Sequence, residues 1–175
     1  MIIAEQKRKE NIAEYLLYMY QVEDMIRANK LDLDSIESTL ISKFEVPYEV
    51  KREMREWYKT LITMMHDEQK ETSGHLKILE TTAEQLSELH HQLLNQGIDN
   101  SYKVAYNKAK PHIEALRMRS GHSKVSDIQV ALNGLYGLLI LKLKKTLITE
   151  ETTHAFDAIR ELVAELSSRY MEQTN

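Results

Sequence analysis

The chain contains no cysteine among its 175 residues. Without thiols it forms no disulfide and offers no thiol chemistry, so its stability does not depend on an oxidising compartment. The cytoplasm is therefore the expected location. The length fits one domain of roughly 100–200 residues, large enough to bury a substantial core. We expect a single all-helical domain spanning residues 1–175.

Glycine and proline are also scarce, with five and two residues respectively. These are the residues that most often interrupt helices or form turns. Between them, apolar residues recur at spacings of three and four positions, which is the periodicity of an amphipathic helix. The sequence therefore predicts an all-α fold, a helical bundle of about six helices.

Long apolar runs and an excess of basic charge are missing as well. The longest stretch without a charged residue, residues 128–141, is shorter than the roughly 20 residues that cross a bilayer. The basic run at residues 7–9 leads into Glu10 and Glu14, unlike the apolar core of a signal peptide. The net charge is −4, whereas dedicated nucleic-acid-binding domains are basic. We expect neither a membrane nor a nucleic acid as partner.

The first predicted helix covers residues 2–28. Apolar and aromatic side chains surround its middle, which is typical of a helix in contact on more than one side. Leu17, Tyr18 and Met25 lie outside its main seam and must meet further helices or a second chain. A short second helix follows.

Asp34 and Glu37 have the spacing of a capping box and mark the start of that second helix. The stretch from residue 47 to residue 95 is then predicted to form one long helix or a bent helix pair. Its apolar phase continues beyond Gly74, and a turn would normally reset that phase. We therefore favour a long helix bent near Gly74, with a hairpin at residues 72–74 as the alternative.

A central apolar helix is predicted for residues 127–147. Ser126 and Gln129 form a capping box at its start. Its middle is apolar on every side, which is typical of a helix surrounded by others. Gly134 and Gly137 are expected to let neighbouring helices approach closely.

Two further helices flank this central one. The helix before it is capped by Asp99 or Ser101 and should be kinked at Pro111, and the last helix starts after Thr149. The predicted core joins six residues: Trp57, Leu61, Leu135, Leu139, Phe156 and Ile159. If Trp57 is buried there, truncation to alanine should cost roughly 3 to 5 kcal/mol.

Two Glu-x-x-His spacings raise the question of a metal site. Glu88 with His91 and Glu151 with His154 match the spacing that helical di-iron proteins use on two of their helices. Metal ligands must project into the bundle, but on a helical wheel both pairs point away from the apolar seams. We expect no metal and no other cofactor.

Polar residues interrupt two apolar faces. Glu68, Thr72 and His75 fall on the inward face of the predicted long helix, and Glu23 lies on the inward face of the first. If buried and paired, such groups bind a small polar ligand or transfer a proton. A buried Glu23 requires a partner, and Arg27, one turn on, is the obvious one. The alternative is that the face is simply exposed there.

No catalytic signature accompanies these residues. The sequence has neither a glycine-rich phosphate loop nor a Ser/His/Asp or Cys/His nucleophile pattern. Lysines at positions 142, 144 and 145 are typical of a solvated helix surface, and also of contact with phosphates or an acidic partner. Because an enzyme would rest on histidine and carboxylates alone, the sequence favours a protein without catalytic activity.

Three segments carry a resemblance to a known family. They are QKRKENIAEYLLYMYQVEDMIRANK near the start, ETSGHLKILETTAEQLSELHHQLL in the middle and LNGLYGLLILKLKKTLITEET near the end. The chain resembles, over essentially its whole length, a Bacteroidetes family of unknown function, domain of unknown function 4924. The resemblance implies one helical intracellular domain and supplies no activity, ligand or catalytic residue.

Two functional hypotheses follow. The first is a non-enzymatic helical module that acts by self-association, most simply as a homodimer, or by binding a protein partner. Its support is that the first helix and the central helix carry apolar residues around more of their circumference than contact with one neighbouring helix requires. The exposed apolar residues, Leu141 among them, would then lie at an interface. The second is a small-molecule-binding protein or enzyme with a polar site at Glu23, Glu68, Thr72 and His75. The sequence does not specify the ligand of such a site.

Overall fold

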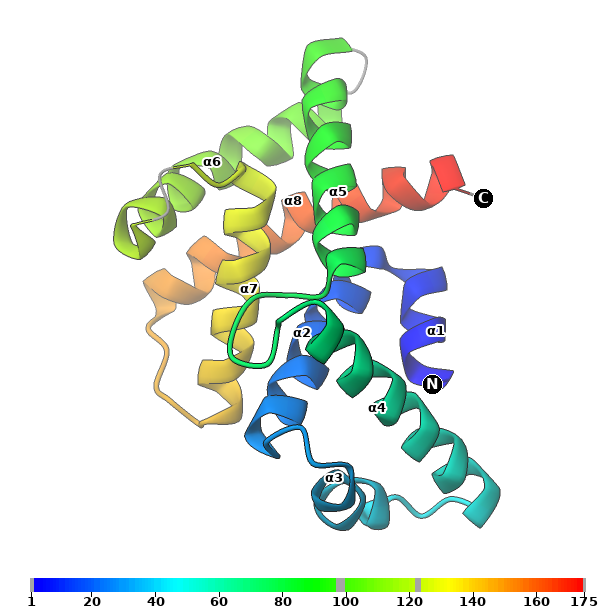
Figure 1. Ribbon diagram of the computed structural model, residues 1–175. Helices are drawn as coiled ribbons and strands as arrows, with labels where there is room; N and C mark the ends of the chain where they lie inside the picture. The colour runs from blue at the N-terminus through cyan, green and yellow to red at the C-terminus, as the bar shows by residue number, and fades with distance from the viewer. Residues whose placement is uncertain (1, 97–99, 122–123, 175) are drawn as a thin grey trace.

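The computed structural model of the protein describes residues 2–96, 100–121 and 124–174. These residues form eight α-helices and one 3₁₀ helix, and they contain no β-strand (Figure 1). The helices are α1 (Ile2–Glu10), α2 (Ile12–Ala28), α3 (Leu33–Thr39), η1 (Ile41–Lys43), α4 (Tyr48–Asp67), α5 (Lys77–Gln96), α6 (Asn100–Ser120), α7 (Asp127–Leu143) and α8 (Glu150–Thr174). The all-α prediction is confirmed, whereas the expected helix number of about six is too low because two predicted helices are each divided.

The first division is at Asn11. Its backbone is extended (φ −155°), and its side-chain oxygen accepts a hydrogen bond from the amide of Glu14, so it caps α2 and separates it from α1. The hydroxyl of Ser167 on α8 donates to the same oxygen at 2.8 Å. The predicted single helix over residues 2–28 is therefore wrong. The apolar residues outside the main seam pack within the chain, because Leu17, Tyr18 and Met25 are half-buried against the core.

The second predicted helix starts earlier than expected. Asp32 caps α3 by accepting from the amide of Ser35 at 2.7 Å. The capping box assigned to Asp34 and Glu37 is wrong, because both carboxylates instead bind the guanidinium of Arg55 on α4, at 2.7 and 2.6 Å.

The second division separates α4 from α5. The predicted long helix is wrong, because α4 ends at Asp67 and residues 68–76 form an irregular connection before α5. Gln69 has φ 56°, and the amides of Gln69 and Lys70 return to the carbonyls of His66 and Met65. This pattern is a Schellman motif, which ends a helix in the left-handed region.

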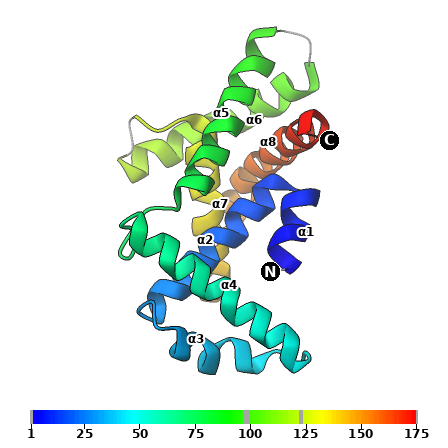
Figure 2. The same ribbon diagram turned by 45° about the vertical axis from the view of Figure 1, so that its right-hand side comes forward.

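The alternative hairpin is also wrong in its geometry, since α5 leads away from α4 rather than back along it (Figure 2). The apolar phase persists across the break because α4 and α5 both pack against α2. Two helices that face the same neighbour need the same inward stripe. Leu76, Leu79 and Ala83 are accordingly buried, as the phase predicts.

Helix α7 is the central helix, as predicted, and packs against α2, α5, α6 and α8. Ser126 caps it by accepting from the amide of Gln129 at 3.1 Å, which confirms the predicted start. A Cβ at Gly134 would lie 2.7 Å from Leu116 on α6, whereas a Cβ at Gly137 would meet nothing within 4 Å. Close approach is therefore confirmed at Gly134 only.

The flanking helices agree with the sequence in part. Thr149 caps α8 by accepting from the amide of Thr152 at 3.2 Å, as expected. Ser101 lies inside α6 and is not its cap, and Asp99 lies outside the described residues. Pro111 is accommodated within α6, which continues to Ser120.

The core gathers buried residues from all eight described α-helices and from η1. Leu61, Leu135, Phe156 and Ile159 are buried in it, as predicted. Trp57 is only half-buried, because Tyr58, at 3% exposure, takes the inward position on α4. Leu139 is also half-buried. Within the described ranges, none of the helices has the length and apolar character that a membrane crossing requires.

Candidate functional site

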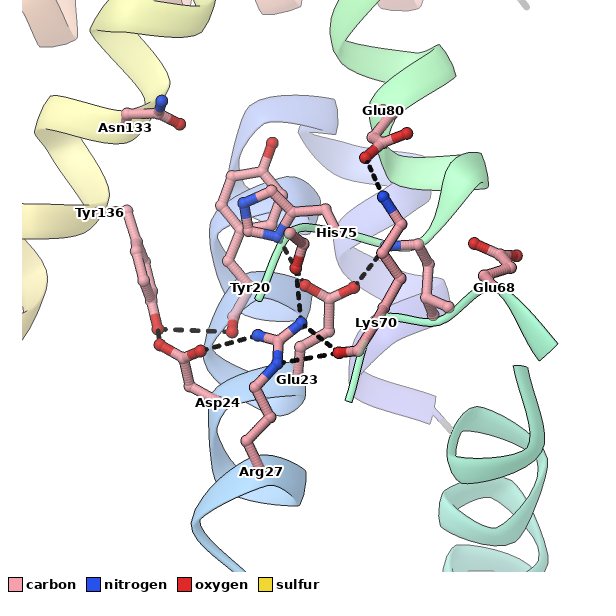
Figure 3. A network of polar contacts seen from close by, with 12 residues as sticks. Tyr20, Glu23, Asp24, Arg27, Glu68, Lys70, His75, Glu80, Asn133 and Tyr136 are labelled. Atoms are coloured by element: carbon pink, nitrogen blue, oxygen red, sulfur yellow. Dashed lines mark hydrogen bonds and ion pairs between the residues drawn. The ribbon is translucent and has the colours of Figure 1, made fainter. Parts of the chain in front are cut away.

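Glu23 is the buried charge at the centre of the sequence-predicted polar site. Its side chain is fully buried on α2. One carboxylate oxygen lies 2.6 Å from Nδ1 of His75, and the other accepts from the amide of Leu76 at 2.8 Å. Both partners belong to the connection between α4 and α5, and Figure 3 shows His75 beside Glu23. The carboxylate therefore binds a segment that is distant in sequence.

Arg27 is not the partner of Glu23 that the sequence suggested. Its guanidinium pairs with Asp24 at 2.9 Å. Its other nitrogens donate to the backbone carbonyls of Lys70, at 3.1 and 3.2 Å, and of Gly74, at 2.5 Å (Figure 3). The planar guanidinium thus binds two backbone carbonyls of the connection at once, which the single ammonium group of a lysine would not do in the same geometry.

Aromatic side chains extend the network to α7. The ring of His75 stacks on Tyr20 with centroids 3.7 Å apart, and Tyr136 meets Tyr20 edge-on at 5.8 Å. The hydroxyl of Tyr136 donates to Asp24 at 2.6 Å. Burial, with help from the Asp24 carboxylate, raises the pKa of Tyr136, so its hydroxyl keeps the proton that it donates. The network joins α2, α7 and the α4–α5 connection.

The remaining predicted members lie apart from this centre. Glu68 is half-buried and accepts from the amide of Lys77 at 2.5 Å, so it stabilises the first turn of α5 rather than meeting His75. Thr72 is exposed. Sequence reasoning missed Asp24, Tyr136 and the pair of Lys70 with Glu80, which lie 2.6 Å apart. The sequence did not single them out, because Asp24, Lys70 and Glu80 are charged residues of a kind common on exposed surfaces and Tyr136 is one of nine tyrosines.

A second polar cluster lies between α5, α6 and α7. His90 is 2% exposed, and its Nδ1 lies 2.6 Å from the hydroxyl of Tyr102. Burial, and the nearby charge of His91, lower the pKa of His90 to about 4. The hydroxyl of Tyr106 donates to Asp127, which also pairs with Arg117. This cluster lacks a sequence signal because its residues come from three helices.

The two Glu-x-x-His pairs face solvent, as the helical wheel predicts. Glu88, His91, Glu151 and His154 are all exposed. No group of three or more potential metal ligands occurs in the described part of the chain. These histidines therefore provide no support for a built metal centre.

Two exposed apolar surfaces carry charged residues of opposite sign. The first is a groove of about 420 Å³ between α1 and the start of α4, called here the α1–α4 groove. Its walls are Ile3, Glu5, Phe44, Val46, Val50, Glu53 and Met54. Ile3 and Phe44 are 40% and 39% exposed, and both charged residues of the lining are glutamates.

The second surface is the end of α7 with the connection that follows, called here the basic tip. It consists of Leu141, Lys142, Leu143, Lys144, Lys145 and Leu147. Its leucines are 41%, 57% and 99% exposed, and its three lysines are exposed as well. The amides of Lys145 and Thr146 close a Schellman motif, so the helix ends at Leu143 and not at residue 147 as predicted.

The two surfaces differ in charge and in position. The α1–α4 groove is apolar with acidic edges, whereas the basic tip presents leucines among lysines. In Figure 1 the groove helices α1 and α4 lie to the right, and the α7–α8 connection lies at the lower left. One chain therefore cannot place its own tip in its own groove.

Comparison with known proteins gives one match. A family model described as a domain of unknown function (DUF4924) matches residues 1–175. Neither the curated proteins nor the solved structures contain a match. The match does not identify a source organism, so the Bacteroidetes origin stays a prediction. The chain belongs to the DUF4924 family.

Proposed function

We propose that the protein acts without catalysis, in the cytoplasm, by associating with a second copy of itself through its exposed apolar surfaces. The observation that supports this most directly is Leu147, which is 99% exposed at the end of the basic tip. Burying a leucine side chain is worth about 1.5–3 kcal/mol relative to leaving it in water. A tip with three leucines gains that stabilisation only against another surface.

The two polar clusters favour a structural role over a ligand site. In the described chain, every buried side-chain nitrogen or oxygen already has a hydrogen-bond partner. A built ligand site keeps some polar groups for its ligand. Glu23 is satisfied by His75 and Leu76, and Arg27 by backbone carbonyls and Asp24. Small-molecule binding or catalysis at this network is therefore the weaker proposal.

Sedimentation velocity over a micromolar concentration series tests the proposal. The 20.5 kDa chain is expected to form larger species as concentration rises. Replacing Leu143 and Leu147 by serine should weaken the association at least about tenfold, because each truncation at the centre of an interface costs more than about 1 kcal/mol and a tenfold change needs about 1.4 kcal/mol.

Met118 provides the matched control. It is 80% exposed on α6 and stands between Arg117 and Arg119, away from both apolar surfaces. Met118→Ser should leave the association unchanged. A wild-type chain that remains monomeric at every concentration would reject self-association as the function, as would equal losses from the tip and control variants.

A further inference from the structure

We infer that the basic tip of one copy docks into the α1–α4 groove of the next, a head-to-tail contact. This inference rests on the proposed function and adds the identity of the two contacting surfaces. Charge determines which surface can bind the basic tip. A tip carrying three lysines repels another basic tip, so a symmetric tip-to-tip contact places like charges together.

The α1–α4 groove offers the complementary chemistry. Its apolar lining includes Val46, Val50 and Met54, and its two charged lining residues are Glu5 and Glu53, both exposed. Tyr48, in the first turn of α4, is 76% exposed beside it. Leucines from the tip would fill the apolar lining while the lysines meet the glutamates at the edges.

The form of the two surfaces agrees with their chemistry. Leu147 protrudes from an irregular connection, and the groove is a concave space of about 420 Å³. Interface energy concentrates where a projecting apolar side chain enters a pocket that excludes water. Charged edges then fix the orientation and speed the encounter.

A tip-in-groove contact uses two different surfaces, so it is heterologous. Such contacts close into a ring if the rotation between copies permits, and otherwise extend into an open filament. Because the groove helices α1 and α4 lie to the right in Figure 1 and the α7–α8 connection lies to the left, each bound copy still presents one of each surface. The assembly is therefore expected to grow beyond a dimer as concentration rises.

Paired charge reversals test the inference on exposed residues whose change leaves the fold intact. The tip variant carries Lys144→Glu and Lys145→Glu, and the groove variant carries Glu5→Lys and Glu53→Lys. Each variant alone brings like charges together and should associate at least about tenfold more weakly than wild type. Equal thermal midpoints at low concentration would show that both variants are folded.

Mixing the two variants gives the decisive result. The acidic tip of one variant now matches the basic groove of the other, and the reverse pair matches as well. An equimolar mixture should therefore regain assembly that neither variant shows alone, and a single chain with all four substitutions should regain it too. High salt should weaken the wild-type assembly because it screens the same charges.

Three outcomes would overturn the inference in distinguishable ways. If the groove variant assembles like wild type, the tip contacts another surface, and the proposed self-association stands. If wild type assembles but the mixture does not recover, charge complementarity between these surfaces is rejected. If wild type is a strict monomer that pellets with phosphatidylserine vesicles, and the tip variant does not, both proposals fail and the tip contacts anionic lipid.

Discussion

Two connections in this molecule begin alike and end differently. The connection after α4 and the connection after α7 both leave their helix through a Schellman motif with a residue other than glycine in the left-handed region, Gln69 at φ 56° and Lys145 at φ 54°. The first then returns to the core, where Leu76 is fully buried. The second leaves Leu147 in solvent at 99% exposure, and only the following residue, Ile148, is half-buried against the core. The same capping motif is thus followed by a buried leucine in one connection and by an exposed leucine in the other.

The difference comes from the neighbouring helix and not from the cap. Alongside the α4–α5 connection, α2 provides a buried carboxylate and a guanidinium that bind its backbone and its histidine. Within the α7–α8 connection, hydrogen bonds between main-chain groups come from the cap itself. An irregular segment is fixed to the core only where polar groups from another element satisfy its backbone.

Leucine truncation in the two connections should give the largest contrast. Leu76→Ala is expected to lower the free energy of unfolding by about 2–5 kcal/mol, because it leaves a cavity in the core. Leu147→Ala should change it by less than about 0.5 kcal/mol. Urea denaturation measures both, at a protein concentration low enough that assembly adds no stability. Similar losses in the two variants would show that the α7–α8 connection is also packed against the chain.

Removing the Glu23 carboxylate, which binds the α4–α5 connection, should lower the free energy of unfolding nearly as much as Leu76→Ala does. Glu23→Ala leaves the amide of Leu76 and the ring of His75 without their partner, and we expect a loss of about 3 kcal/mol. Glu14→Ala is the matched control on the same helix, because Glu14 forms an ion pair with Lys7 and its side chain is 59% exposed. That control should cost less than about 1 kcal/mol. Equal midpoints for the two variants would mean that Glu23 does not hold the connection.

Lowering the pH should reduce the free energy of unfolding through the protonation of His90. Its pKa is lowered to about 4 in the folded chain, against about 6.5 for an unperturbed histidine. The unfolded chain therefore binds the proton first as pH falls. The stability from neutral His90 is complete above about pH 6.5 and is lost down to about pH 4, by about 3 kcal/mol. The α7–α8 connection has no histidine, so this loss belongs to the interior.

Two variants separate His90 from other titrating groups in the acid experiment. His90→Asn keeps a polar atom near the Tyr102 hydroxyl but removes the imidazole, so it should flatten the decline of stability between pH 6.5 and 4. The neighbouring His91 is exposed, and His91→Asn should leave the decline in place. An unchanged pH profile in the His90 variant would assign the decline to carboxylates elsewhere.

The comparison also explains what the sequence can predict. Side-chain caps are visible as residue types, so the starts of α7 at Ser126 and of α8 at Thr149 are predicted correctly. The ends of α2, α4 and α7 carry no such signal, because Lys30, Gln69 and Lys145 occupy positions where glycine is usual. The sequence therefore predicts only a bend near Gly74, whereas α4 ends several residues earlier, at Asp67.

For the polar site, the sequence predicts that Glu23 is a buried charge but does not identify the residues that pair with it. Glu23 is recognisable as a charge on an apolar face, which requires a partner. The nearest candidate in sequence, Arg27, was the wrong one, since the partner His75 lies 52 residues further along the chain. The basic tip was predictable in part: the sequence singles out Leu141 and the three lysines, but not the end of the helix at Leu143. Periodicity places Leu141 and its neighbours on an apolar helix but does not show where the surrounding helices end.

Glycine substitutions at the two caps should give the smallest effect and the most direct test of their equivalence. A non-glycine residue in the left-handed region costs about 1–2 kcal/mol, and part of that is offset because glycine makes the unfolded chain more flexible. Gln69→Gly and Lys145→Gly are each expected to raise the free energy of unfolding by about 0.5–1 kcal/mol. Alanine at the same positions does not relieve the strain of the left-handed backbone, so it should not raise the free energy of unfolding. If glycine stabilises both connections equally, the caps are equivalent and the contacts of Glu23 and Arg27 account for the difference between them. A gain at Lys145 without one at Gln69 would contradict this, because the anchored connection would then prefer a side chain at its cap.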